Sequence, residues 1–172
     1  MQTFEKATIK KIIEGKKIIE GKVPISIEIK GNRVDISGNE EDRYVGEKIL
    51  EAINLGFDLE TSLLLKETDY LLEIVPIKDL SRSKKLSVVK GRIIGKAGRT
   101  LEILQELSDC YITLKDSNVN IIGKSEEIKF AINAVKSLIS GSKQANIYSY
   151  LEKARKKFFP SDLGLKEDFK KL

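Results

Sequence analysis

The chain has 172 residues, of which 41% are hydrophobic and 33% are charged; this balance is typical of a globular chain long enough for one ordinary domain or two small ones. It contains one cysteine and no histidine, which excludes an internal disulfide, a Cys/His zinc site and a Ser-His or Cys-His catalytic arrangement. No apolar run approaches the roughly 18 residues of a membrane span, and the N-terminus lacks the apolar core of a signal peptide. We therefore expect a cytoplasmic protein with no membrane partner.

The net charge of +5 is distributed unevenly along the chain. Residues 1–79 carry 12 basic and 16 acidic side chains, whereas residues 80–159 carry 16 basic and 7 acidic ones. An excess of cations in one segment favours a polyanionic partner for that segment. A solvated, lysine-rich surface would have the same composition, so charge alone leaves both interpretations open.

In the first half, residues 34–38 predict a strand, and residues 40–54 after it predict a helix that ends before Gly56. The acidic residues 40–42 resemble a metal-binding cluster, but their place directly after Asn39 is that of a helix first turn, where the dipole favours carboxylates. The inward face of this helix is formed by apolar residues at helical spacing: Val45, Ile49, Ala52 and Ile53.

The second half begins with a predicted strand over residues 70–77, in which Pro76 lies near the end or on an edge. A short helix is predicted from about residue 83 to Ile94, ending at Gly95, and a second helix begins at Gly98. The apolar side chains of the second helix form one face: Leu101, Leu104 and Leu107, with Ile103 beside them.

Two short strands follow, over residues 111–114 and 119–122, with a turn at residues 116–118. A long helix is predicted next, with Ser125 as its N-cap and Gly141 as its end. The order strand, helix, helix, strand, strand, helix predicts an α+β fold. The apolar stripe of the last helix has nearly ideal spacing: Ile128, Ala131, Ile132, Val135, Leu138 and Ile139.

Residues 142–159 predict a C-terminal amphipathic helix, and residues 160–172 form a tail without a readable function. We expect Tyr150 to lie in the core, because it shares an apolar face with Ile147 and Leu151. Cys110 opens a strand, where a small buried side chain is expected, so we predict a packing role for it.

The two halves resemble each other. Val-Asp-Ile-Ser-Gly at residues 34–38 matches Val-Asn-Ile-Ile-Gly at residues 119–123, and each precedes acidic residues and a long helix. Residues 12–17 echo residues 93–97 more weakly, with Ile18 in place of the second loop glycine. Chance can explain five residues but accounts less well for the shared order of elements. The pattern indicates a diverged repeat.

The segment Gly95-Lys96-Ala97-Gly98 joins the two short helices of the second half. Two glycines allow a sharp turn and a close approach of another backbone, and the following helix presents free N–H groups at its start. A nucleotide-binding P-loop does not fit, because Gly91 lies four rather than five residues before Gly95 and Ala97 replaces the Ser or Thr. The loop together with its flanking elements is typical of a KH domain, which clamps about four nucleotides of a single strand.

Residues 91–100, Gly-Arg-Ile-Ile-Gly-Lys-Ala-Gly-Arg-Thr, resemble the signature of archaeal members of the partner-of-Nob (Pno, also Dim) family of small-subunit ribosomal RNA-processing factors. Residues 69–74 and 147–157 are also similar, and the resemblance extends over about residues 39–158. It implies two packed KH domains, of which the first is degenerate. It also implies binding near the 3′ end of 16S rRNA, with a Nob-type endonuclease and the alpha subunit of translation initiation factor two as partners.

We therefore predict a degenerate KH-like domain at residues 1–67 and a type I KH domain at residues 68–141. The chain is expected to bind single-stranded rRNA, without catalysis, cofactor or metal. The alternative is a protein-interaction adaptor that uses the KH fold mainly as a scaffold, and a metal-dependent enzyme ranks third. The basic end of the last helix is either an RNA contact or a set of cations favoured by the helix dipole. The predicted RNA-binding residues are Arg92, Ile94, Gly95, Lys96, Ala97, Gly98, Arg99, Ile112, Leu114 and Arg155.

The charge distribution generates a first prediction. If phosphate neutralisation and base stacking dominate, the affinity for a short single-stranded RNA should fall steeply as salt rises. Fluorescence anisotropy titrations at several salt concentrations measure this slope. Duplex DNA should bind more weakly in the same assay, because a KH groove reads unstacked bases. A flat salt response would contradict the electrostatic part of the prediction.

Overall fold

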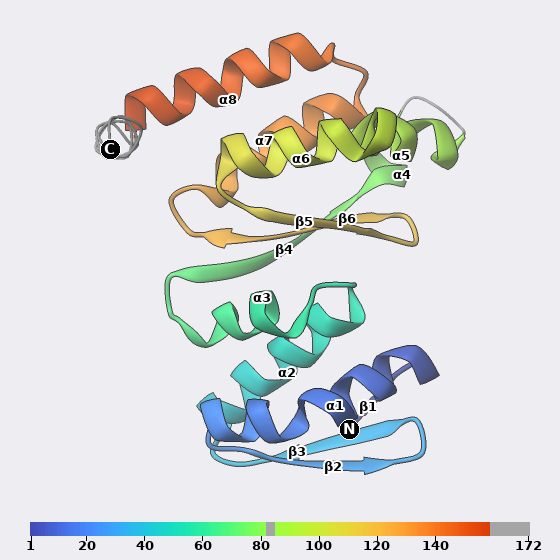
Figure 1. Ribbon diagram of the computed structural model, residues 1–172, viewed down its shortest axis with the longest axis vertical. Helices are drawn as coiled ribbons and strands as arrows, with labels where there is room; N and C mark the ends of the chain where they lie inside the picture. The colour runs from blue at the N-terminus through green and yellow to red at the C-terminus, as the bar shows by residue number, and fades with distance from the viewer. Residues whose placement is uncertain (82–84, 159–172) are drawn as a thin grey trace, which may run out of the picture.

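The computed structural model describes residues 1–81 and 85–158, and Figure 1 shows two halves stacked along the long axis of the molecule. Within these residues, none of the helices combines the length and the apolar character needed to cross a membrane. The elements of the first half are β1 (Gln2–Thr3), α1 (Lys6–Lys22), β2 (Ser26–Lys30), β3 (Arg33–Ser37), α2 (Glu40–Asn54), α3 (Leu59–Leu63) and the 3-10 turn η1 (Leu64–Lys66).

The second half follows the predicted order of strand, helix, helix, strand, strand and helix, and the mixed α/β architecture is confirmed. One short helix, α4, is added after the first strand. The elements are β4 (Tyr70–Pro76), α4 (Ile77–Leu80), α5 (Leu86–Ile94), η2 (Lys96–Gly98), α6 (Arg99–Ser108), β5 (Tyr111–Lys115), β6 (Asn118–Lys124), α7 (Ile128–Ile139) and α8 (Gln144–Phe158).

Each half contains a three-stranded antiparallel sheet with the same strand arrangement. The orders are β1-β3-β2 and β4-β6-β5, so in both sheets the last strand in sequence lies in the middle. In the second sheet, β6 pairs with β4 over its full length, from Tyr70 opposite Lys124 to Pro76 opposite Asn118. The central strand is therefore fully paired, while β4 and β5 are the edges.

Both faces of the second sheet are covered, as the stacking in Figure 1 shows. On one face, Val119 and Ile121 of β6 pack in a core that α5, α6 and α7 complete. On the other face, Ile122 belongs to the core of the first half, with Leu50 and Ile53 of α2. Because side chains alternate across a strand, β6 supplies apolar groups to both cores, and the second sheet connects the two halves.

The first half departs from the predicted echo of the loop. The segment around Gly15 belongs to one continuous helix of 17 residues, Lys6–Lys22, with no helix-loop-helix break. Gly15 is buried there, and a Cβ atom on it would lie 3.0 Å from the side chain of Leu59. This glycine permits close helix packing rather than a loop.

Two predicted boundaries shift, and a third cannot be compared. Ile77 begins α4 instead of ending the strand, and the predicted start of the next helix at residue 83 lies outside the described residues. Ser125 is not the N-cap of α7, which begins at Ile128. The reason is pairing: the amide of Ser125 donates to the carbonyl of Asp69 at 2.8 Å, so the ladder continues past the end of β6 and a turn precedes the helix.

Helix α8 runs over Gln144–Phe158, and its buried side is formed by Ile147, Leu151 and Ala154. The prediction that Tyr150 is a core residue was wrong, since this side chain is 36% exposed. Its ring lies 6.4 Å from the ring of Phe130, at the border of the contact between α7 and α8. The apolar stripe of α8 is wider than the surface that the two helices below it can cover.

Cys110 is buried as predicted. Burial raises the pKa of its thiol to about 12, and the thiol donates to the carbonyl of Ser108 at 3.3 Å. The thiol therefore stays protonated at neutral pH and acts as a small packing group. Its neighbour Gly123 leaves room for it, because a Cβ atom there would clash with the sulfur of Cys110.

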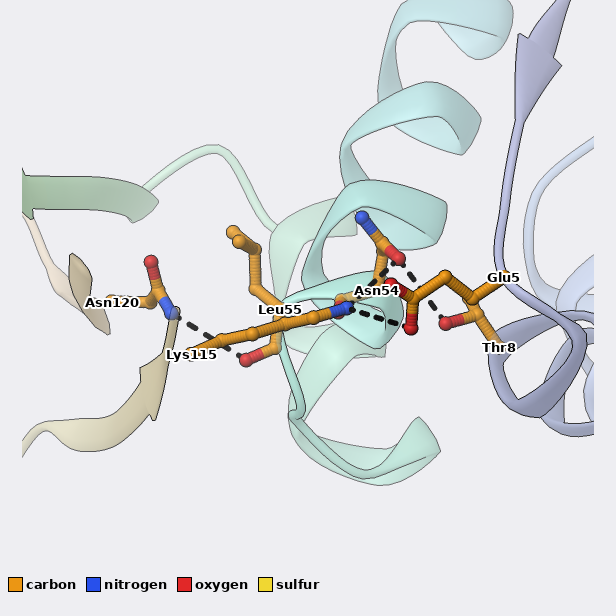
Figure 2. A network of polar contacts seen from close by, with 6 residues as sticks. All are labelled: Glu5, Thr8, Asn54, Leu55, Lys115 and Asn120. Carbon is orange, nitrogen blue, oxygen red and sulfur yellow. Dashed lines mark hydrogen bonds and ion pairs between the residues drawn. The ribbon is translucent and has the colours of Figure 1, made fainter. Parts of the chain in front are cut away.

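The two halves are joined by polar side chains of the second sheet that bind the C-terminal end of α2 (Figure 2). Lys115 donates to the carbonyl of Asn54 at 2.6 Å and to its side-chain oxygen at 3.2 Å. The carbonyl of Leu55 accepts from Thr113 at 2.9 Å and from Asn120 at 3.5 Å. Carbonyls at a helix end lack partners within the helix, and cations are favoured there. The second half thus supplies hydrogen-bond donors to the carbonyls at the C-terminal end of α2.

Replacing Lys115 with methionine should lower the free energy of unfolding by about 1–3 kcal/mol, because the α2 carbonyl is left without its charged donor. Lys136→Met on the exposed surface of α7 is the matched control and should change it by less than about 0.5 kcal/mol. Urea unfolding followed by circular dichroism measures both. Equal effects of the two substitutions would mean that the junction contributes no specific stability.

Candidate nucleic-acid interface

The loop between α5 and α6 has a backbone that depends on its two glycines. Gly95 has φ 74° and ψ −179°, a region that is essentially restricted to glycine, and Gly98 has φ 76° and ψ 5° in the left-handed region. Ala97 between them also has a positive φ, 52°. Three positive φ angles within four residues reverse the chain sharply and project Lys96 and Ala97 into solvent.

Gly95 is required for a second reason, which is the closeness of Thr100. A Cβ atom at position 95 would meet the hydroxyl and the Cβ of Thr100 far inside van der Waals distance, whereas one at position 98 would meet nothing within 4 Å. Thr100 is buried, at 4% exposure, in the first turn of α6. The loop therefore folds back against the helix that follows it.

Gln144 connects this loop to the C-terminal helix. At the start of α8, its side-chain amide donates to the hydroxyl of Thr100 at 2.9 Å and to the carbonyl of Arg92 at 3.4 Å. One side chain thus holds both ends of the loop. Neither Thr100 nor Gln144 was among the predicted site residues, and 44 residues separate them in sequence, so no local pattern indicates the pair.

The tip of the loop offers backbone donors. The N–H groups of Gly95 and Gly98 bond to the carbonyls of Gly91 and Gly95. Within residues 1–81 and 85–158, the N–H groups of Lys96 and Ala97 have no hydrogen-bond partner. Two adjacent exposed N–H groups beside the start of α6 form a site suited to a phosphate oxygen.

Three of the predicted cations surround the loop, and one does not. Arg92, Lys96 and Arg99 are exposed. Arg99 pairs with Glu102 at 3.1 Å, but both side chains are more than 60% exposed, so this pair is weak and can be exchanged for a phosphate. Arg155 lies eleven residues along α8 from Gln144, about 16 Å away by helix rise. It donates to the carbonyl of Glu106 at the far end of α6.

The predicted apolar groove is only partly exposed. Ile94 is 39% exposed at the end of α5, and Leu114 on β5 is half-buried. Ile112 is 4% exposed and belongs to the core, so its side chain supports the groove from beneath and offers no face to a base. Its backbone N–H points away from β6 and donates to the side-chain oxygen of Gln105 at 2.8 Å. Gln105 is a further residue that was not predicted.

Alanine substitutions at the two glycines should separate their roles. Gly98→Ala introduces only a left-handed alanine, which costs about 1–2 kcal/mol of unfolding free energy. Gly95→Ala adds the collision with Thr100, which should cost about 1–3 kcal/mol more. Urea denaturation of both variants measures the difference. The same loss of stability in both would contradict the close packing of the loop on α6.

Residues 71–156 match the family model described as the eukaryotic type KH-domain (KH-domain type I), in its version for the second domain of PNO1. A KH domain-containing protein of Methanocaldococcus jannaschii is 31% identical over 149 residues, which are 83% of this chain and 66% of that protein. The pre-rRNA-processing protein PNO1 of Eremothecium gossypii is 38% identical over 109 residues, 62% of this chain and 41% of that protein.

These curated relatives are longer than the part that this chain matches, which is less than two thirds of each. A solved structure from Pyrococcus horikoshii, the complex of a/eIF2alpha, aDim2p and rRNA, contains a chain with a TM-score of 0.82 and 30% identity. The match covers 91% of this chain and 93% of that one. The family model and the relatives agree on one assignment: this chain belongs to the Pno/Dim family of KH-domain proteins.

Proposed function

We propose that this chain is a non-catalytic RNA-binding factor that acts on small-subunit rRNA near the 3′ end of 16S rRNA. The observation that carries the proposal is the loop from Gly95 to Gly98, with its two exposed N–H groups and three surrounding cations. The relatives support the RNA class, because they are named as pre-rRNA-processing proteins and one structural neighbour is solved with rRNA. A cytoplasmic location remains part of the prediction.

In this proposal the phosphate backbone of a single strand lies across the loop tip. The N–H groups of Lys96 and Ala97 bind a phosphate oxygen, and the side chains of Arg92 and Arg99 neutralise its neighbours. The bases then lie toward Ile94 and Leu114, with Ile112 beneath them. Arg155 is too far along α8 to share this site, so an RNA contact there would involve nucleotides outside the groove.

We assign residues 68–141 to the type I KH domain and residues 1–67 to a degenerate KH-like domain. Two observations support a shared origin of the two halves. Both sheets have the same strand order, and in each half a long helix follows the last strand. The first half has the continuous helix α1 where the second has its loop. We therefore expect the first half to contribute little direct RNA affinity.

A role as an adaptor between proteins is the second candidate. It is favoured by the neighbour solved together with a/eIF2alpha as well as rRNA. We propose the alpha subunit of translation initiation factor two as a partner of this chain, bound through the acidic first half. A Nob-type endonuclease stays a prediction from the family resemblance. The two functions are compatible, because the RNA loop and the first half lie on opposite sides of the second sheet.

The loop variant Lys96→Asp/Ala97→Asp tests the RNA function. Position 97 has a left-handed backbone that aspartate tolerates, and both positions are exposed, so the fold should be kept. The new carboxylates repel phosphate, and the substitution of Lys96 also removes a cation. We therefore expect the affinity for an RNA oligonucleotide of the 16S 3′ end to fall about 10- to 100-fold. Fluorescence anisotropy measures the affinity.

The matched control is Ala7→Asp/Lys10→Asp, which makes the same two substitutions at exposed positions of α1 in the first half. It should leave RNA affinity within about twofold of the parent at moderate salt, since charges beyond the screening length contribute little. Circular dichroism verifies that both variants are folded. A folded loop variant that binds RNA as tightly as the control would refute the assignment, and the adaptor function would then take its place.

A further inference from the structure

Strand β4 has one side without a partner strand. It lies at the edge of the second sheet, since the strand order is β4-β6-β5. The strand is seven residues long, Tyr70–Pro76. Long edge strands with exposed apolar residues are uncommon, because their unpaired backbone groups attract other chains. Two apolar side chains of this strand, Leu71 and Ile74, are each 40% exposed.

Two hydrogen bonds establish which backbone groups of β4 point away from the sheet. The amide of Ser125 donates to the carbonyl of Asp69, and the amide of Ile77 donates to the carbonyl of Ser117. Both pairs continue the register of β4 with β6. Because hydrogen-bonding direction alternates along an antiparallel strand, odd-numbered residues of β4 face β6 and even-numbered residues face outward.

The outward positions are therefore Tyr70, Leu72, Ile74 and Pro76. Pro76 has no N–H group and occupies an edge position where none is needed. The N–H of Tyr70 donates to the carbonyl of Glu67. In the part of the chain that the structure describes, the outward N–H and C=O groups of Leu72 and Ile74 have no hydrogen-bond partner. The edge of β4 thus offers two residues, Leu72 and Ile74, for hydrogen bonding to another strand, and Tyr70 and Pro76 limit it on either side.

A groove lies beside this edge, between β4 and α2. It has a volume of about 360 Å³, and Tyr44, Lys48, Leu65, Lys66 and Leu72 are among its lining residues. Tyr44 is 61% exposed. Carboxylates balance the two lysines of the groove. Lys48 pairs with Glu51 at 3.0 Å and Lys66 with Glu67 at 3.2 Å, and Glu73 also lines the groove. The groove therefore has apolar surface and little net charge, which does not suit a phosphate backbone.

We propose that the outer edge of β4 binds an extended segment of a partner protein as a fourth strand of the second sheet. Backbone groups of the segment pair with Leu72 and Ile74, and its apolar side chains on the same face as these two residues contact the groove at Tyr44. The segment's residue between its two apolar residues lies opposite Glu73, which is exposed and also lines the groove. Opposite charges attract in such cross-strand positions, so the segment has the pattern apolar, Lys or Arg, apolar.

A second copy of this chain fits the edge poorly. Two antiparallel β4 strands that pair through Leu72 and Ile74 have their two-fold axis at the intervening residue, so Glu73 would face Glu73 of the copy. Like charges directly opposite each other destabilise a sheet. Glu73 therefore disfavours pairing with a second copy and favours a partner segment that carries a Lys or Arg opposite it.

The probe is a blocked peptide, acetyl-Ser-Thr-Val-Lys-Val-Thr-Ser-amide, titrated into the full chain labelled with ¹⁵N. We expect the amide signals of Leu72 and Ile74 to shift and to become protected from hydrogen exchange, with smaller shifts at the loop of residues 95–98. A peptide with Glu in place of Lys should bind about fivefold or more weakly, and a peptide N-methylated at the two valines should not bind detectably.

Two variants of one position complete the test. Ile74→Pro removes an outward N–H and should weaken peptide binding about fivefold or more, whereas Ile74→Val keeps the N–H and should bind like the parent. If the proline variant does not fold, the N-methylated peptide tests the same hydrogen bonds on the unaltered protein. Equal binding of the methylated and unmethylated peptides would overturn the proposal. So would dimerisation of the free protein with protection of Leu72 and Ile74 before any peptide is added.

Discussion

The architecture depends on the contact between the C-terminal end of α2 and the inner face of the second sheet. A helix end leaves carbonyl groups without partners, and in a buried position this is unfavourable unless another element supplies donors. Lys115, Thr113 and Asn120 supply them from strands β5 and β6. Ile122 of β6 packs in the core of the first half. The contact therefore has a defined geometry, which apolar packing alone does not impose.

This junction determines which surfaces remain available for binding. A three-stranded sheet with helices on one side has a second face that must be either solvated or covered. Here the first half covers it, and Asn120 is completely buried as a result. The side-chain oxygen of Asn120 has no hydrogen-bond partner among the described residues, so the junction is not fully satisfied. The loop at residues 95–98 and the edge of β4 both lie outside the covered face.

The loop illustrates how a short motif depends on distant residues. Its two glycines and flanking cations were recognisable in the sequence, and so were the helices on both sides, because amphipathic spacing and glycine stops are local signals. The support of the loop by Thr100 and Gln144 was not recognisable, since α8 reaches the loop only after the chain has passed through two helices and two strands. For the same reason Arg155 was grouped with the loop although α8 carries it to the far end of α6.

The sequence by itself determined the order of the main elements in the second half, the long helices α2 and α7, the loop and the concentration of cations in the second half. Each of these follows from residue type and spacing over a few turns of chain. Tertiary structure alone decided that α1 is one unbroken helix packed on Leu59 and that the pairing of β4 with β6 delays the start of α7. It also decided that Ile112, expected in the binding groove, is buried, and that Tyr150, expected in the core, is exposed. The physical reason is common to all of them: burial and backbone pairing depend on what another segment places nearby, and that information is spread over the whole chain.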